Sequence, residues 1–241
     1  MLHNEVHSHQ VTPFSRFQEY LGEFVYGGID GCVTTFAVVS GSVGAGLDSS
    51  VIIILGFANL LADGFSMSVG AYLSTKSERD NYEKHKRTEH WEIKNFPEEE
   101  KQEITDIYRA KGFDGELLDQ VVNVIIHDKE RWVDDMMKNE LGMIKNQKSP
   151  VAIGLVTYLS FIAIGLIPLS IYVWDYVAPL NGNPFLWTIS FTSVGFLVIG
   201  FLKSYVTGVN KFRGMIETLA LGMIAAGVAY FVGDVLEGLV K

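Results

Sequence analysis

The distribution of apolar residues constrains this chain most, because several apolar runs are long enough to cross a bilayer. A spanning helix needs about 20 mainly apolar residues. Five runs approach or exceed that length, and the mean hydropathy of the whole chain is +0.21. They cover residues 24–47, 51–73, 151–174, 185–202 and 215–235. We therefore expect an all-α integral membrane protein with five transmembrane helices.

Most charged residues lie in one segment between the second and third apolar runs. Of the 47 Lys, Arg, Asp and Glu residues, 32 lie between Lys76 and Lys148. This segment holds 18 acidic and 14 basic side chains, so it carries a small net negative charge. Such a balance disfavours nucleic acid as a partner and mildly favours cations. We expect a polar insert between two membrane-spanning parts.

Helix signals inside the insert predict a small helical bundle. Pro97 is followed by three glutamates, which favours a helix start, and Gly112 is typical of a helix end. Asp114 and Asp128 are candidate N-cap residues for two further helices. Apolar residues at helical spacing within 117–125 and 132–137 supply each of these helices with a face to bury.

The positions of Lys and Arg predict the orientation in the membrane, since basic residues beside a span stay on the cytoplasmic side. They precede the first run, fill the insert and precede the fifth run, whereas the other two loops have none. We expect a cytoplasmic N-terminus with a short amphipathic helix (1–21), transmembrane helices 1–2 (22–74), a cytoplasmic helical domain (75–149) and transmembrane helices 3–5 (150–241). The membrane is the plasma membrane in a prokaryote, or a vacuolar or other organelle membrane in a eukaryote.

Three short acidic patterns in the insert suggest a site for divalent metal. The two glutamate pairs are each spaced by three residues, so each pair projects from one face of a helix. The third pattern combines two thioethers with a carboxylate, a mixture that favours a first-row transition ion. The candidate ligands are Glu89, Glu92, Glu100, Glu103, Met136, Met137 and Glu140. Acidic pairs are also common on solvated helix faces, and Met often fills cores, so the prediction rests on the combination.

Two acids lie well inside the apolar runs, whereas Glu217 and Asp234 lie near the ends of the fifth run. Ionisable residues inside a membrane usually serve function. Asp30 lies in the first run, and Asp63 lies in the second between Asn59 and Met67. Asn59, Asp63 and Met67 are spaced i, i+4, i+8, which places an amide, a carboxylate and a thioether along one stripe of the second span. Such a stripe suits a cation path. Hydrogen bonding between helices is the structural alternative. Gly27-x-x-x-Gly31 beside Asp30 suggests a homodimer in which two copies of the first span meet.

Two other classes of protein remain to be weighed. A ferritin-like di-iron oxidase would need Glu-x-x-His, and no histidine here has Glu three residues before it. A membrane-anchored metal sensor without transport would need no polar residues such as Asp30 and Met67 inside its spans. Cys32 is the one cysteine, so the chain cannot build a disulfide framework or a thiolate zinc site. We expect a transporter, not an enzyme.

Four motifs together resemble the vacuolar iron transporter family. They are Asp30-Gly31 in the first run, Ser66-Met67 with Gly70 in the second, WVDDMMKNELG over residues 132–142, and Gly165-Leu166-Ile167-Pro168 in the third run. The resemblance implies a dimer of five-helix protomers with a cytoplasmic metal-binding domain. It also implies that the domain collects Fe²⁺ before proton-coupled export from the cytosol, with Mn²⁺ as a possible second substrate and no resident cofactor.

The resemblance also implies roles for individual residues. The seven candidate ligands of the insert match the family's metal-binding glutamates and methionines, and Asp30 and Met67 match its pathway residues at the dimer interface. Asn59 is a departure, because plant members have a glutamate at this position. Asn cannot release a proton, and we hypothesise that Asp63, one turn further along, supplies the missing carboxylate.

Overall fold

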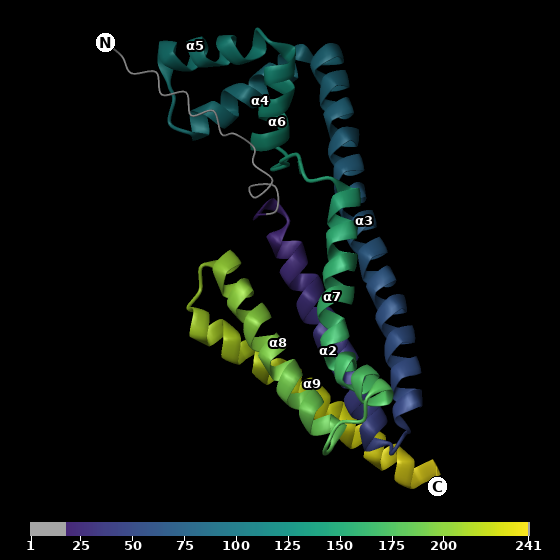
Figure 1. The fold of residues 1–241 in the computed structure, drawn as a ribbon. Helices are drawn as coiled ribbons and strands as arrows, with labels where there is room; N and C mark the ends of the chain where they lie inside the picture. The colour runs from purple at the N-terminus through teal and green to yellow at the C-terminus, as the bar shows by residue number, and fades with distance from the viewer. Residues whose placement is uncertain (1–17, 241) are drawn as a thin grey trace, which may run out of the picture. The chain divides into compact units, whose positions relative to one another are not determined.

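A computed structural model describes residues 18–240, and this range is helical apart from the segments that connect the helices, of which 140–149 is the longest (Figure 1). The helices are α2 (Leu21–Gly44), α3 (Ser49–Asn95), α4 (Pro97–Ala110), α5 (Gly115–Ile126), α6 (Lys129–Asn139), α7 (Pro150–Val177), α8 (Pro184–Thr207) and α9 (Lys211–Val240). No strand occurs in this range, so the predicted all-α class is confirmed. The short amphipathic helix was expected within residues 1–21, of which residues 1–17 lie outside the described part.

The chain forms two compact units, which are treated separately. Within the described residues, the first, called here the membrane unit, takes in 18–72 and 151–240, and the second, called the insert unit, covers 73–150. Helix α3 begins in the membrane unit and ends in the insert unit as one helix of 47 residues. The second span was expected to end near Leu73, but its helix continues to Asn95.

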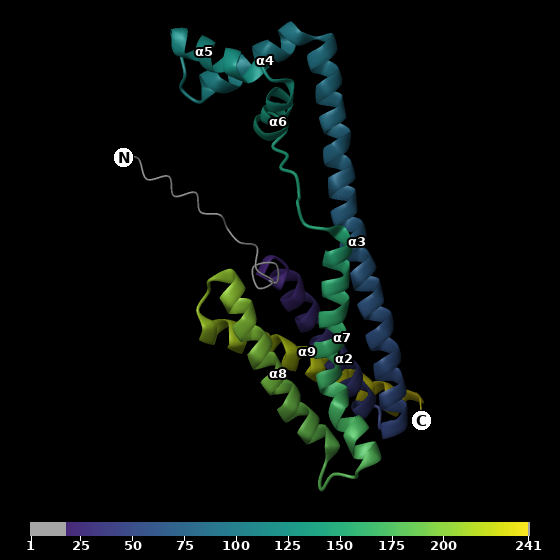
Figure 2. The same cartoon turned by 45° about the horizontal axis from the view of Figure 1, so that its top comes forward.

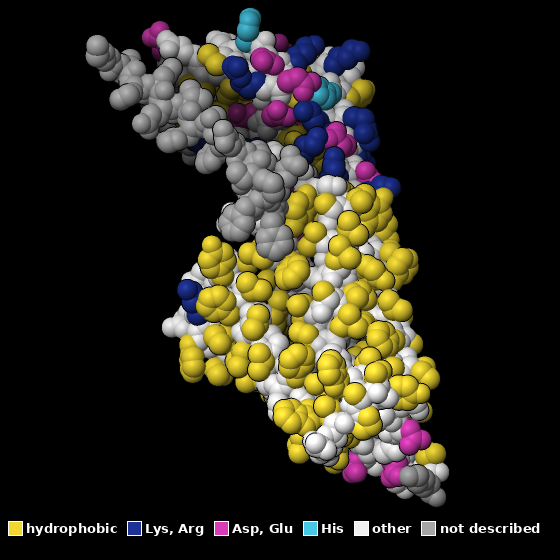
Figure 3. All heavy atoms as spheres, viewed as in Figure 1, with side chains coloured by type: hydrophobic (Ala, Val, Ile, Leu, Met, Phe, Trp, Pro, Cys, Tyr) yellow, Lys and Arg dark blue, Asp and Glu magenta, His cyan; other side chains and the backbone are white. Residues whose placement is uncertain are grey.

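Five helices within residues 18–240 are long and apolar enough to cross a membrane, as the sequence predicts. These are α2, α3, α7, α8 and α9. Their outward surfaces are apolar, and Figure 3 shows hydrophobic side chains over most of the visible face of this unit. Soluble proteins rarely expose apolar patches of more than a few hundred Å². Lipid is therefore the solvent that suits this surface.

Glycines let the helices of the membrane unit approach closely. A Cβ added at Gly31 would overlap the backbone carbonyl of Phe161 in α7, and one at Gly27 would overlap the Ser160 side chain. Near the other end of α2, a Cβ at Gly44 would overlap the Tyr230 carbonyl of α9. Helices α2, α8 and α9 pack side by side in both views (Figures 1 and 2).

This packing corrects one expectation about the first span. The Gly27-x-x-x-Gly31 pair was expected to face a second copy of the chain. Both glycines instead pack against α7 of the same chain, where Thr157, Ser160 and Phe161 fill the space beside them. The close helix contact that this motif permits is thus used inside the protomer. The pair supplies no argument for a dimer.

The insert unit has a hydrophobic core of its own. Helices α4, α5 and α6 begin where the sequence signals indicate, after Phe96, Asp114 and Asp128 respectively. Asp128 caps α6, since its side chain accepts hydrogen bonds from two backbone N–H groups; Asp114 makes no such bond. Residues from α3 complete the core. The buried residues of this core are Tyr82, Ile93, Ile104, Leu118, Val122, Ile125, Trp132, Val133, Met136 and Met137.

Candidate metal centre

Two pairs of glutamates lie on either side of the turn between α3 and α4. Glu89 and Glu92 belong to the last two turns of α3, and Glu100 and Glu103 belong to the start of α4. Pro97 allows this arrangement, because it ends the long helix and begins the next. Of the four, Glu89 is only 3% exposed and Glu100 only 6%. Such burial is unusual for a carboxylate and requires compensation.

The carboxylates of this region repel one another. Burial is the largest cause that raises the pKa of Glu89 to about 7, and the negative charges of the other four candidate glutamates follow. Burial likewise raises the pKa of Glu100 to about 7, again followed by its acidic neighbours. The pKa of Glu140 is raised by burial and then by Glu103 and Glu92. All five candidate glutamates thus lie within electrostatic reach of each other, and we call them the glutamate cluster.

Helix α6 adds two methionines, which share the insert core with Ile93 and Ile104, the sequence neighbours of Glu92 and Glu103. Met136 and Met137 are fully buried in the insert core, and Glu140 follows one turn later as the C-cap residue of the same helix. Thioethers and carboxylates together are a ligand set for a first-row transition ion rather than for Mg²⁺ or Ca²⁺. The sequence-predicted ligands of the insert therefore come from three helices and lie in one region.

The orientation of the side chains in this structure is not that of a closed metal site. No three His, Cys, Asp or Glu side chains within residues 18–240 are arranged to hold a metal ion. One carboxylate oxygen each of Glu89 and Glu100 is buried without a hydrogen-bond partner among the residues that the structure describes. A buried acceptor left unpaired costs about 1–3 kcal/mol, and more when it is charged. A cation between these oxygens would relieve both the repulsion and the missing partners.

Sequence reasoning missed a set of contacts, two lysine ion pairs and one histidine–glutamate contact, that joins α6 to α3. Lys86 Nζ lies 2.9 Å from Asp134 Oδ1 and 3.1 Å from Glu130 Oε2, and His90 Nε2 lies 3.2 Å from the other oxygen of Glu130. We call this the α3–α6 clamp. A signal was present in the spacing, because both the two bases and the two acids are four residues apart and so lie on single helix faces. The clamp fixes α6 beside the helix that carries Glu89.

The acids of the membrane unit also lie near each other. Asp30 of α2 and Asp63 of α3 are close enough for their charges to interact. Asn59 lies one turn before Asp63 on the same helix, and its side-chain nitrogen is buried without a hydrogen-bond partner in the described part of the chain. Met67 packs against the core cluster that contains Leu60 and Phe161. The predicted stripe thus lies on one continuous helix, and its acidic member Asp63 is within electrostatic reach of Asp30.

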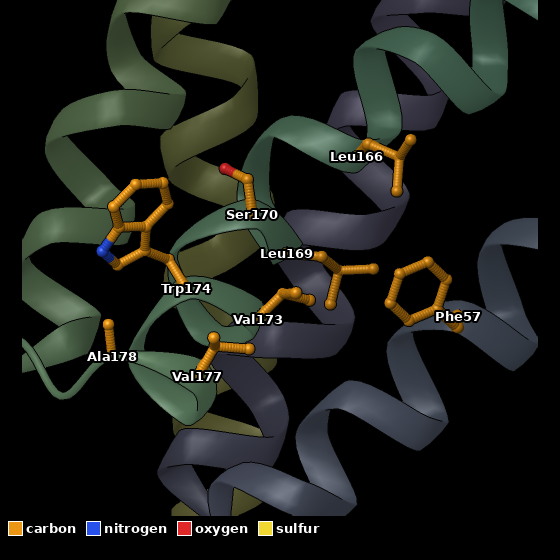
Figure 4. Close-up of a pocket in the computed structure, with 8 residues that line it drawn as sticks. All are labelled: Phe57, Leu166, Leu169, Ser170, Val173, Trp174, Val177 and Ala178. Carbon is orange, nitrogen blue, oxygen red and sulfur yellow. The ribbon is translucent and has the colours of Figure 1, made fainter.

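An apolar cavity of about 560 Å³ in the membrane unit offers no alternative metal site (Figure 4). It lies along α7 and is lined by Phe57, Leu166, Leu169, Ser170, Val173, Trp174, Val177 and Ala178. Ser170 contributes the one hydroxyl, which already donates a hydrogen bond of 2.7 Å to the Ile167 carbonyl. Without a free polar ligand, this cavity suits apolar contact rather than an ion.

The fold and these residues define a class of protein: a helical multi-pass membrane protein with an acidic, methionine-containing cluster on an insert between its second and third candidate spans. The model of the VIT family matches residues 21–234. A protein named vacuolar iron transporter from Toxoplasma gondii is 35% identical over 236 residues, which cover 95% of this chain and 78% of the relative. The chain belongs to the VIT family, as its motifs suggest.

Other relatives carry similar names. A vacuolar iron transporter from Plasmodium falciparum is 34% identical over 91% of this chain and 83% of its own length. Vacuolar iron transporter 1 from Tulipa gesneriana is 30% identical over 97% of this chain and 94% of its own length. All of these relatives are named as transporters, which fits the expectation that this chain is not an enzyme.

Proposed function

We propose that this protein exports divalent transition metal from the cytosol, with Fe²⁺ as its main substrate and Mn²⁺ as a second one. The observation that carries this proposal is the glutamate cluster: five carboxylates that repel one another beside two buried thioethers. Such a group is costly without a cation and is suited to binding one. The names of the relatives support iron as the metal and transport as the activity.

In the proposed mechanism, the insert loads the metal. Glu89, Glu92, Glu100, Glu103 and Glu140 supply oxygen ligands, and Met136 and Met137 supply sulfur. The raised pKa values of Glu89 and Glu100 mean that both carboxyl groups are partly protonated near neutral pH. Because a ligand carboxylate must be deprotonated, binding of the metal releases protons. Loading is therefore favoured on the side of the membrane where the pH is higher.

Transfer through the membrane rests on a smaller set of residues. Asp30 and Met67 offer one carboxylate and one thioether, and Asp63 offers a second carboxylate near Asp30. Asn59 provides an amide oxygen but cannot carry a proton. Protons entering from the far side would compete for the two aspartates and displace the metal. In this way an inward proton gradient drives metal outward.

The proposal includes an orientation and an assembly. The basic residues of the insert and of the turn before α9 favour a cytoplasmic insert and N-terminus. The homodimer proposed with the family resemblance stands on that resemblance, because the glycine pair of α2 is occupied by α7. The membrane is that of a vacuole or other organelle in a eukaryote and the plasma membrane in a prokaryote.

Flux in proteoliposomes under an imposed pH gradient tests the proposal. Wild-type protein should move Fe²⁺ and Mn²⁺, and Asp30→Ala should abolish movement of both. Asp234→Ala is the matched control, since this exposed aspartate lies near the end of α9. If wild-type protein moves neither ion but still binds metal, the sensor interpretation replaces the transporter.

The role of Asp63 requires a separate variant. Asp63→Asn keeps the size of the side chain and removes its ability to carry a proton. We expect slower transport with a changed pH dependence, because one of the two membrane carboxylates is lost. Normal transport with an unchanged pH dependence would show that Asp63 does not replace the missing glutamate at position 59.

A further inference from the structure

The basic residues of the membrane unit are gathered at one end. Its described residues, 18–72 and 151–240, contain three Lys or Arg: Lys203, Lys211 and Arg213. All three lie beside the turn between α8 and α9. On the visible face of this unit, Figure 3 shows basic side chains at that turn and acidic ones at the opposite end of the bundle. The turn therefore carries a local positive potential.

Two of these three cations have no acidic partner. Lys203 Nζ lies 3.2 Å from Glu217 Oε2, so this pair is close to neutral. Lys211 Nζ instead lies over the ring of Phe201, 5.2 Å from its centroid. Among the described residues, neither Lys211 nor Arg213 forms an ion pair. Two net positive charges are therefore available to an anion at the α8–α9 turn.

The turn itself is held in a defined conformation. Gly208 ends α8 in the left-handed region with φ 69°, where a residue with a Cβ would be strained. Asn210 then caps α9, since its Oδ1 accepts hydrogen bonds from the backbone N–H groups of Phe212 and Arg213 at 3.0 and 3.4 Å. These contacts fix the backbone from which Lys211 and Arg213 extend.

Exposed apolar side chains surround the same turn. Phe212 is 72% exposed, Tyr205 57% and Val209 48%. Trp and Tyr are enriched where the apolar membrane interior meets the headgroups. Exposed Tyr205 and Phe212 beside Lys211 and Arg213 are therefore the arrangement expected where basic side chains reach the lipid phosphates.

We propose that the α8–α9 turn binds the headgroup phosphate of an anionic phospholipid. Arg213 offers a planar pair of donors to two phosphate oxygens, and Lys211 adds a point charge. Phe212 and Tyr205 contact the upper part of the acyl chains. A zwitterionic lipid gains less here, because its own cation is repelled by the two basic side chains. Each basic residue near an anionic lipid surface contributes about fivefold to affinity.

Native mass spectrometry of the full-length protein in a neutral detergent tests this proposal. The protein is titrated with short-chain phosphatidylglycerol, with phosphatidylcholine of the same chain length, and with inorganic phosphate. Phosphatidylglycerol should bind more tightly than phosphatidylcholine, and salt should weaken its binding. The double variant Lys211→Gln, Arg213→Gln should lose about 25-fold in affinity for phosphatidylglycerol.

The control has the same change in charge at another place. Lys84→Gln, Lys129→Gln alters two exposed lysines of the insert unit that form no ion pair in the described structure, and it should bind phosphatidylglycerol as wild type does. Lys211→Arg, Arg213→Lys keeps both charges and should keep most of the affinity, which separates loss of charge from loss of folding.

Three results would overturn the proposal. Equal binding of the two lipids would show that charge does not select the ligand. Unchanged binding by the glutamine double variant would place the lipid elsewhere. If inorganic phosphate displaces phosphatidylglycerol at equal concentration, the turn binds soluble anions and the lipid assignment is wrong.

Discussion

Metal binding to the glutamate cluster is expected to weaken steeply as the pH falls from about 8 to about 6. Glu89 and Glu100 both have a pKa of about 7, and both must lose a proton to act as ligands. Each carboxyl group is roughly nine-tenths deprotonated at pH 8 and roughly one-tenth at pH 6. Two such groups together lower the apparent affinity about 100-fold over this interval.

The affinity is measured with metal-free, full-length protein in detergent. Equilibrium dialysis against radiolabelled Mn²⁺ at a series of pH values gives the dissociation constant without the oxidation that complicates Fe²⁺. The slope of log affinity against pH reports the number of protons released. Below the pKa it should approach two, and above about pH 8 it should fall toward zero.

Single substitutions separate the two groups. Glu89→Gln removes one titrating ligand. The variant should bind Mn²⁺ more weakly than wild type at every pH, and its affinity should fall only about tenfold from pH 8 to pH 6. Glu98→Gln is the matched control, because this glutamate is exposed in the first turn of α4 and lies outside the predicted ligand set. A wild-type affinity that is flat across this range would refute the argument, and so would a two-proton slope retained by Glu89→Gln.

Further predictions concern stability. The folded-state pKa values of Glu89 and Glu100 lie above the unfolded value of 4.5. The contribution of these two groups to the stability of the metal-free insert should therefore be largest below about pH 4.5 and be lost as the pH rises through about 7. Chemical denaturation at several pH values measures this loss. Gly31→Ala should lower stability by about 1–3 kcal/mol, because its Cβ overlaps a carbonyl of α7, whereas Gly70→Ala, with open space around it, should not; thermal unfolding in detergent compares them. Lys86→Met should cost about 0.5–1 kcal/mol in insert stability, since the clamp is partly exposed, and a loss above 3 kcal/mol would show a larger role.

Much of the fold could be predicted from the sequence, because hydropathy and helix signals are local. The five spans and the starts of α4, α5 and α6 follow from apolar runs, Pro97 and the two aspartates before the helices. The length of α3 did not follow, because the end of its apolar run was taken as the end of the helix. Residues 73–95 contain neither Gly nor Pro, so a change from apolar to polar side chains does not interrupt the backbone hydrogen bonds.

The packing partners could not be predicted in the same way. Gly27 and Gly31 indicate that a helix approaches closely, but the pattern does not say which one, and the structure gives α7 of the same chain. The clamp between Lys86 and the acids of α6 joins residues more than forty positions apart. Such pairs depend on the tertiary arrangement, for which a single sequence holds no direct signal.

The number of candidate ligands differs between the two regions, and this difference bears on transport. The insert brings together five carboxylates and two thioethers, whereas the membrane stripe offers Asp30, Asp63 and Met67. Fewer anionic ligands bind a divalent cation less tightly, so a metal passing from the first set to the second gives up electrostatic attraction. In the proposed mechanism, release then requires only that protons neutralise two aspartates. A cluster as acidic as the insert's inside the membrane would hold the cation too tightly to let it leave.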